Sequence, residues 1–207
     1  MNFRNPKYLL ILDFEANCSN NNTRDHEICE FPVVLLDIET KTIVDEFRTF
    51  VKPVKIQKIS NFIHKLTGIT DKDIATGVTW TEAINLFNDF IIKHDCTSQN
   101  STIVTCGNWD LFTMFPRQCT ITNTKNIIPN RVKNLFSQWT NVKVVYSNFK
   151  KYTKLYGMGL MLDDIGLKLV GRHHSGIDDC RNITEICIYL LNNGCVNELF
   201  EAIEKSK

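Results

Sequence analysis

The sequence predicts an α/β domain with a mixed five-stranded sheet flanked by helices. Residues 8–14 form a continuous apolar run with an acidic end, which is typical of a central strand covered on both faces. Two more strand-like runs, 31–38 and 42–51, are separated by a short polar segment that predicts an antiparallel hairpin. Helical and strand patterns then alternate, so we expect three antiparallel strands on one side of the sheet and two parallel strands on the other.

The later elements follow from apolar periodicity and from turn residues. Thr70 with Asp73 predicts the start of a short helix, and Thr79 or Thr81 the N-cap of the next. Pro116 is expected to stop a helix that begins at Trp109, and the polar stretch 118–129 is expected to be a loop. We predict strands at 102–106 and 142–146, and helices at 56–66, 81–93, 131–139, 159–166, 177–191 and 196–203.

Length and composition favour one domain over residues 1–207, with a core at about 7–195 and a C-terminal helix within 196–207. The net charge of +1 gives no overall signal for nucleic acid, so such binding must come from a local patch or through metal ions. No apolar run reaches the roughly 18 residues of a membrane span. The eight cysteines are scattered without a CxxC pair, which favours reduced thiols in cytoplasm or nucleus over a disulfide framework or a zinc ribbon.

Asp13 and Glu15 lie two residues apart at the end of the first strand, so they point to the same face of the sheet. This is the edge where open α/β sheets bind ligands. Two neighbouring carboxylates repel each other and favour a cation between them. The alternative is a strand that simply runs into solvent.

Asp110 follows a glycine turn at the end of the predicted strand 102–106. It is either a third acid at the same edge or an ordinary helix N-cap. Trp109 beside it is either a core residue or a platform on which a base stacks.

His174 and Asp179 flank the start of the long helix near the C-terminus. Ser175 and Asp178 resemble a capping box, which places the helix start near Gly176. Asp179 lies on the otherwise apolar face of this helix, and a buried carboxylate needs a cation or several hydrogen bonds. His174 can reach the same cleft and is predicted to be a general base.

Together these residues predict a two-metal site for phosphodiester hydrolysis. Carboxylate oxygens suit Mg²⁺ or Mn²⁺ rather than zinc. Two such ions would hold the scissile phosphate, and His174 would take a proton from the attacking water.

At these residues the chain resembles a DEDDh 3′→5′ exonuclease of the ribonuclease-H-like superfamily, and in more detail the Eri-1/3′hExo exoribonuclease family. The similarity covers about residues 7–195. The motifs that carry it are DFEANC at 13–18, HEICEFPVVLL at 26–36, LTGIT at 66–70, GNWD at 107–110 and HSGIDD at 174–179.

The resemblance implies two Mg²⁺ ions held by Asp13, Glu15, Asp110 and Asp179, with His174 as the base. It also implies a 3′-terminal nucleotide near Glu15, Ala16 and Leu111, and release of nucleoside 5′-monophosphates. Family members act on small-RNA duplex overhangs, histone-mRNA stem-loops and 5.8S ribosomal RNA ends, so small-RNA or ribosomal complexes are candidate partners. Some carry an N-terminal SAP nucleic-acid-binding domain; we expect none here, which weakens the expectation of specific stem-loop recognition.

Further residues are candidates for contact with a single-stranded 3′ end. Arg172, beside His173 and His174, is close enough to the site to touch phosphate. The others have two interpretations each: Ile69 lines the base pocket or belongs to a simple turn. His26 and Glu27 rim the cleft or order the loop before the second strand. A candidate basic patch, or else a solvated loop, contains Lys150, Lys151, Tyr152, Lys154 and Tyr156.

Three other functions compete with an exoribonuclease. A DEDDh deoxyribonuclease would share the same five residues. A non-catalytic RNA-binding module would be expected to lack at least one of them, and an RNase-H-like endonuclease would not have the HxxxxD spacing. The C-terminal helix packs on its own domain or on a second copy, so the oligomeric state is open.

Overall fold

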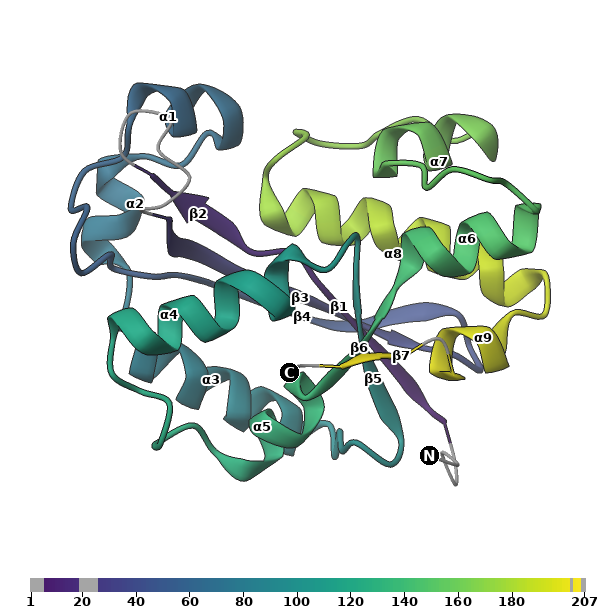
Figure 1. Ribbon diagram of the computed structural model, residues 1–207, viewed down its shortest axis with the longest axis horizontal. Helices are drawn as coiled ribbons and strands as arrows, with labels where there is room; N and C mark the ends of the chain where they lie inside the picture. Colours follow the sequence, from purple (N-terminus) through teal and green to yellow (C-terminus); the bar gives the residue numbers. More distant parts are fainter. Residues whose placement is uncertain (1–5, 19–25, 202, 206–207) are drawn as a thin grey trace.

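The computed structural model describes residues 6–18, 26–201 and 203–205. In these residues one mixed sheet runs through the middle of the molecule, with helices on both sides (Figure 1). Its strands are β1 (Tyr8–Leu12), β2 (Glu15–Asn17), β3 (Glu27–Asp37), β4 (Thr42–Phe50), β5 (Ser101–Thr105), β6 (Gln138–Asn141) and β7 (Ile203–Lys205). The helices are α1 (Asn61–Thr67), α2 (Asp71–Thr76), α3 (Trp80–Lys93), α4 (Phe115–Ile121), α5 (Asn130–Phe136), α6 (Val142–Lys150), α7 (Met158–Asp164), α8 (Gly176–Asn192) and α9 (Val196–Glu201).

The strand pairing confirms the predicted mixed sheet. β3 pairs antiparallel with β4 on one side and with β1 and its continuation β2 on the other. β1, β5 and β6 run parallel, so their carboxyl ends meet at one edge. In the described residues two short strands, β2 and β7, join the sheet in addition to β1, β3, β4, β5 and β6, and β7 pairs antiparallel with β6.

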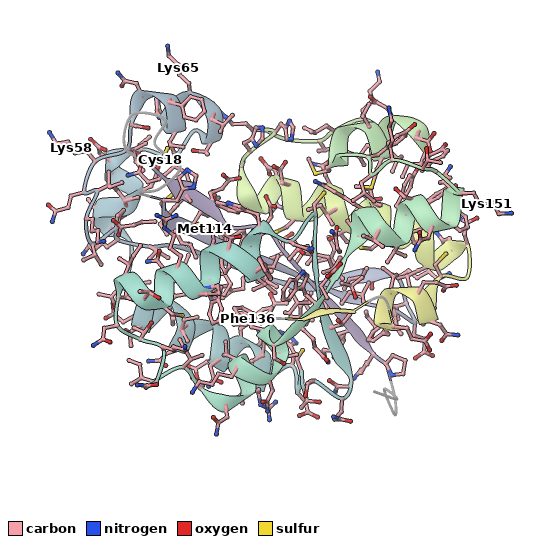
Figure 2. The ribbon with its side chains drawn as sticks, viewed as in Figure 1. Cys18, Lys58, Lys65, Met114, Phe136 and Lys151 are labelled. Atoms are coloured by element: carbon pink, nitrogen blue, oxygen red, sulfur yellow. The ribbon has the colours of Figure 1, made fainter. Side chains whose placement is uncertain are left out.

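The central strand β1 separates two apolar cores. Leu10 and Leu12 belong to the core that contains residues of α3 and α5, whereas Leu9 and Ile11 belong to the core under α6, α7 and α8. Burying one such side chain stabilises the fold by about 1.5–3 kcal/mol relative to leaving it exposed. Figure 2 shows Lys58, Lys65 and Lys151 pointing outward at the periphery, well away from this packed centre. The two cores fix β1, and with it the position of the residues that follow.

The predicted strand at 142–146 is wrong, because this segment is the first half of α6. The side chain of Asn141 caps that helix by accepting a hydrogen bond from the backbone of Lys143 at 3.1 Å. The strand comes earlier, as β6, whose four residues are all buried. Its polar side chains find distant partners: Trp139 donates to Asn108, and Thr140 to the carbonyl of Leu199. Helix α5 accordingly ends at Phe136, before the predicted 139.

The helix stop at Pro116 and the loop at 118–129 are also wrong in part. Trp109–Met114 is a π-helical segment, in which the backbone of Phe115 donates to the carbonyl of Asp110. α4 continues directly from it, with Pro116 in the first turn, where a missing N–H costs nothing. The helix therefore extends to Ile121.

The other boundaries are close to prediction. Thr70 and Thr79 cap α2 and α3 with complete capping boxes. α8 begins at Gly176, but the predicted box of Ser175 and Asp178 is absent, since Ser175 makes no side-chain capping bond. α9 ends at Glu201, ahead of β7. Within the described residues, each helix is too short or too polar to cross a bilayer.

The predicted helix at 56–66 is shortened to α1, which Ser60 caps. Two buried side chains hold the preceding segment in an extended path. The Glu27 carboxylate accepts hydrogen bonds from the backbone of residues 54, 55 and 56. Asn17 donates to the carbonyls of Ile56 and Lys58. Glu27 therefore orders the segment before α1. The loop before the second strand, which Glu27 was expected to order, lies largely outside the described residues, so the two interpretations of Glu27 stay predictions.

Candidate active site

Asp13 and Glu15 lie at the point where β1 passes into β2. Phe14 between them points into the core, where its ring lies 4.9 Å from that of Phe31 and 6.0 Å from that of Trp80. This anchor leaves the two carboxylates on the other side of the strand, as the two-residue spacing predicted. Asp13 is half-buried and Glu15 is buried.

Asp110 is tied to the same point by a backbone bond. Its Oδ1 accepts a hydrogen bond from the backbone nitrogen of Phe14 at 2.8 Å. The helix N-cap interpretation of Asp110 is wrong, because Asn108 occupies the capping position of the π-helical segment. Trp109 is 39% exposed, with its ring 5.8 Å from that of His26. It is therefore not a core residue, and its role as a stacking platform stays a prediction.

Asp179 is buried in the first turn of α8 and faces the other acids. Its Oδ2 accepts a hydrogen bond from the backbone of His174 at 2.8 Å, while its buried Oδ1 has no partner in the described residues. The approach of α8 depends on Gly176. A Cβ at this position would lie 2.8 Å from the carbonyl oxygen of Asp13 and 3.2 Å from Cγ of Glu15. Only glycine allows the helix to come this close to the acidic strand.

His174 lies in a tight turn before α8, with a backbone φ of 66°. Its ring stacks on that of the exposed His173 at a centroid distance of 4.0 Å. Burial, and then the neighbouring His173, lower the pKa of His174. A neutral imidazole at this place can accept a proton, as the predicted role requires.

The carboxylates are close enough to share a cation. Ligand atoms of Asp13, Glu15 and Asp179 all lie within 4.8 Å of one another, and so do those of His173, His174 and Asp179. Burial and then the charge of Asp13 raise the pKa of Glu15 to about 10, and burial raises those of Asp110 and Asp179 to about 7 and about 6. Burial and the charge of Asp110 also raise the pKa of Asp13.

The raised pKa values and the unpartnered oxygen of Asp179 have one cause: the described residues place too little positive charge beside these buried carboxylates. Four acids of this kind fit a divalent metal site, because oxygen ligands suit hard cations. Asp110 is not part of either group of three, but its hydrogen bond with the backbone of Phe14 places it beside Asp13.

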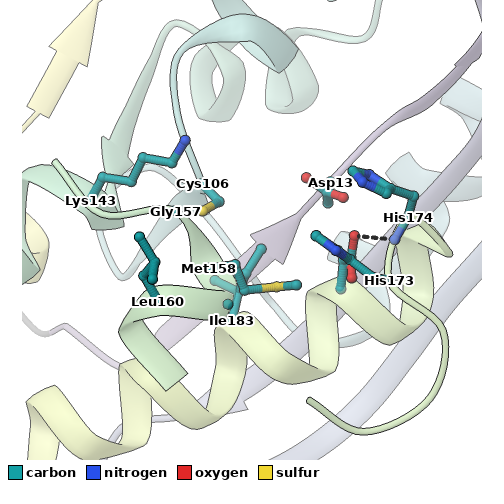
Figure 3. A pocket seen from close by; sticks show the side chains of 11 residues that line it. Asp13, Cys106, Lys143, Gly157, Met158, Leu160, His173, His174 and Ile183 are labelled. Carbon is teal, nitrogen blue, oxygen red and sulfur yellow. Dashed lines mark hydrogen bonds between the residues drawn. The ribbon is translucent and has the colours of Figure 1, made fainter. Parts of the chain in front are cut away.

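A cleft of about 440 Å³ opens beside the acids (Figure 3). One end holds Asp13 and the two histidines, and the other holds Cys106 and Lys143. Asp179 also lines the cleft and is hydrogen-bonded to the backbone of His174. Lys143 was not predicted as a site residue, because its segment has the β-branched pattern of a strand. The remaining lining residues are Gly157, Met158, Gly159, Leu160 and Ile183.

Of the residues predicted to bind the nucleotide, His174 lines this cleft, and Ala16, Leu111 and Ile69 lie outside it. Ala16, Leu111 and Ile69 are all buried, and Ile69 packs with Cys29 and Ile74. Their contact with a terminal nucleotide stays a prediction.

The contact of Arg172 with phosphate stays a prediction. The guanidinium donates to the carbonyls of Lys65 and Leu66, so it connects the end of α1 to the turn that carries His174. In the candidate basic patch, Lys150 pairs with Asp164 at 3.1 Å. Tyr152 also donates to Asp164, which favours the interpretation as a structured surface loop over a nucleic-acid patch.

The fold and the site together define a nuclease domain whose acids come from β1, the segment after β5, and α8. Residues 10–187 match the family model described as Exonuclease, and the chain belongs to this family.

Comparison with individual proteins places it among the DEDDh enzymes of the Eri-1/3′hExo branch, as the motifs predicted. The nuclease domain of 3′hExo, a DEDDh family member solved bound to rAMP, is 32% identical, with a TM-score of 0.86 and coverage of 98% of both chains. Human 3′-5′ exoribonuclease 1 is 34% identical over 94% of this chain and 56% of its own length. Mouse ERI1 exoribonuclease 3 is 34% identical over 91% of this chain and 55% of its own. The chain thus spans about half the length of these curated relatives.

Proposed function

We propose that this chain is a metal-dependent 3′→5′ exoribonuclease that releases nucleoside 5′-monophosphates from RNA 3′ ends. The observation that carries the proposal is the convergence of Asp13, Glu15 and Asp179 within 4.8 Å, with His174 bonded to the last of them. The names of the relatives support RNA as the substrate. Two similar proteins are called exoribonucleases, and one similar solved structure is of a 3′-exonuclease that recognises the histone mRNA stem-loop.

Asp13, Glu15, Asp110 and Asp179 would hold two divalent ions, and their oxygen ligands favour Mg²⁺, with Mn²⁺ as a substitute. When bound, such ions neutralise the scissile phosphate and polarise it for attack. The pairing of Asp110 with Phe14 and of Asp179 with His174 fixes two of the ligands before any ion binds.

His174 would take the proton from the attacking water. The backbone bond to Asp179 and the stacked ring of His173 hold the imidazole at the cleft. As the water oxygen bonds to phosphorus, the bond from phosphorus to the 3′-oxygen of the preceding nucleotide breaks. That oxygen then takes a proton from solvent, and the phosphate stays on the released nucleoside.

The substrate would be a single-stranded 3′ end or overhang. Glu15, Ala16 and Leu111, with Trp109 and Ile69, are the proposed neighbours of the terminal nucleotide. Small-RNA duplexes, histone mRNA and ribosomal RNA ends are the candidate sources, and cytoplasm or nucleus the proposed compartment.

A time course with Mg²⁺ on matched RNA and DNA oligonucleotides, labelled at the 5′ or 3′ end, tests the proposal. We expect stepwise shortening of 5′-labelled RNA and release of a mononucleotide from the 3′ label. EDTA and the Asp110→Asn variant should abolish both. RNA binding without shortening would overturn the proposal and leave a binding module.

The DNA arm of this experiment tests the deoxyribonuclease alternative. A DEDDh deoxyribonuclease would share the same five residues, and a further similar structure, cell-death related nuclease 4, matches with a TM-score of 0.81 at 25% identity under a name that states no substrate. Faster loss of DNA than of RNA would move the assignment to that class.

A further inference from the structure

Each of the three parallel strands is followed by a charged residue at the same edge of the sheet. Two of these residues are acids and the third is a lysine. Asp13 follows β1, and Asp110 follows β5. Lys143 follows β6, the third parallel strand, as the second residue of α6. Its position at the carboxyl end of a parallel strand is the place where α/β sheets bind ligands.

The Lys143 amine faces the cleft. It is half-buried, lines the 440 Å³ cleft, and makes no hydrogen bond or ion pair with any residue that the structure describes. A Cβ on Gly107 would lie only 3.6 Å from Nζ, so the amine lies over the turn that leads to Asp110. Its charge lowers the pKa of both Asp13 and Asp110, although burial outweighs this effect.

Lys143 and His174 lie on opposite sides of Asp13 in this cleft (Figure 3). In an in-line displacement the attacking water and the departing oxygen lie on opposite sides of the phosphorus. If His174 activates the water, the departing 3′-oxygen and the strand attached to it lie away from the histidine. The upstream strand therefore leaves the acids on the side where Lys143 is.

We propose that the Lys143 ammonium group binds the phosphate immediately 5′ of the scissile phosphate, forming a subsite for the nucleotide that remains on the shortened strand. This proposal rests on the proposed exonuclease function. The subsite takes a phosphodiester anion, which a flexible ammonium group binds as a point charge. The apolar side chains of Met158 and Leu160 line the cleft nearby and offer a surface for the sugar and base of that nucleotide.

The test removes the charge from that phosphate alone. Two RNA oligonucleotides are compared for removal of their first 3′ nucleotide: an unmodified one, and one with a methylphosphonate at the linkage just 5′ of the scissile bond. We expect wild type to cleave the modified RNA about tenfold more slowly, the effect of losing one charge-assisted hydrogen bond. Lys143→Ala should cleave both at the same reduced rate, and Lys143→Arg should restore part of the difference.

The controls separate a subsite from other roles. Lys133→Ala changes an exposed lysine on α5 and should keep the wild-type discrimination. A methylphosphonate several linkages further upstream should not be sensed by Lys143. If Lys143→Ala slows both RNAs equally while the tenfold difference remains, the lysine only offsets the charge of the acids and the proposal is overturned. If wild type fails to shorten unmodified RNA, the proposed function itself has failed.

Discussion

Two buried glutamates on neighbouring strands differ in their hydrogen-bond partners, although burial raises the pKa of both. Glu15 of β2 and Glu30 of β3 are direct partners across the sheet. Glu30 accepts hydrogen bonds from Arg48 at 2.8 Å and from the backbone of Gly176 at 3.3 Å. In the described part of the chain, the Glu15 carboxylate makes no hydrogen bond and no ion pair, and its neighbours are the acids Asp13 and Asp179.

The difference separates acids that hold the fold together from acids that bind something else. Glu27, on the same strand as Glu30, has its charge offset by three backbone amides. A buried charge that the fold itself offsets needs no ligand, whereas an uncompensated one costs several kcal/mol until a cation arrives. The pKa of Glu15, about 10, records that cost, and burial is its largest cause.

Replacing the uncompensated glutamate should have the largest effect on activity. We expect Glu15→Gln to lower the hydrolysis rate by about 10³-fold, the size of loss seen when an electrostatic contact to a transition state is removed. Its thermal stability without metal should stay the same or rise, because the variant removes one of the repelling charges. Initial rates in saturating Mg²⁺, with melting curves as a folding control, measure both. A variant within tenfold of wild type would show that Glu15 is not a metal ligand.

Metal binding should stabilise the protein through the same acids. At a Mg²⁺ concentration of 100 times its Kd, we expect the free energy of unfolding to rise by about 2.7 kcal/mol. EDTA should reverse the gain, and Glu15→Gln should show a much smaller one. Thermal denaturation with and without the ion measures this directly. Equal gains in wild type and variant would mean that Mg²⁺ binds elsewhere.

The five residues predicted for the site could be singled out because each lies beside a strong local signal. Asp13 and Glu15 end an apolar strand, and Asp179 stands on an apolar helix face beside a predictable helix start. Such signals depend only on neighbours in the chain. The backbone bond from Phe14 to Asp110 spans 96 residues, so no local pattern could reveal it.

The failures have the same physical origin. Val142–Lys150 begins with the β-branched pattern of a strand, yet it is a helix because β6 already occupies the sheet position before it. The polar residues of β6 did not have the pattern of a buried strand. The hydroxyl of Thr140 can be buried there because it donates to the carbonyl of Leu199, far along the chain. Because residues 142–146 were predicted to be a strand, Lys143 was not placed at the start of a helix beside the site.

Replacing the compensated glutamate should have the reverse profile. Glu30→Gln leaves Arg48 without its anion, and we expect the free energy of unfolding to fall by about 1–3 kcal/mol. Because the glutamine oxygen can still accept from Gly176, the start of α8 should be kept. Urea denaturation measures the loss, and the Mg²⁺-induced gain should persist in this variant. Loss of that gain, with the fold intact, would place Glu30 among the metal-binding acids.

The smallest expected effect concerns Asp45 on β4, whose contribution to the free energy of unfolding should depend on pH. Its Oδ2 lies 2.7 Å from Nζ of Lys93 and 2.8 Å from Nε2 of His94, and these hydrogen bonds lower the pKa of Asp45 to about 2. A pKa that folding lowers adds stability above the unfolded value of about 3.9, and this stability is lost as the pH falls toward 2. Asp45 is partly exposed, so we expect less than about 1 kcal/mol.

The stability difference between wild type and Asp45→Asn should therefore shrink between pH 6 and pH 2.5, as urea denaturation at each pH can measure. Folding raises the pKa values of the cleft acids instead, so the sign there is opposite: protonation favours the folded state. If the stability difference between wild type and Asp45→Asn grew on acidification, Lys93 and His94 would not be offsetting the charge of Asp45. Hydrogen-bonded cations would then not be enough to distinguish structural acids from ligand-binding acids.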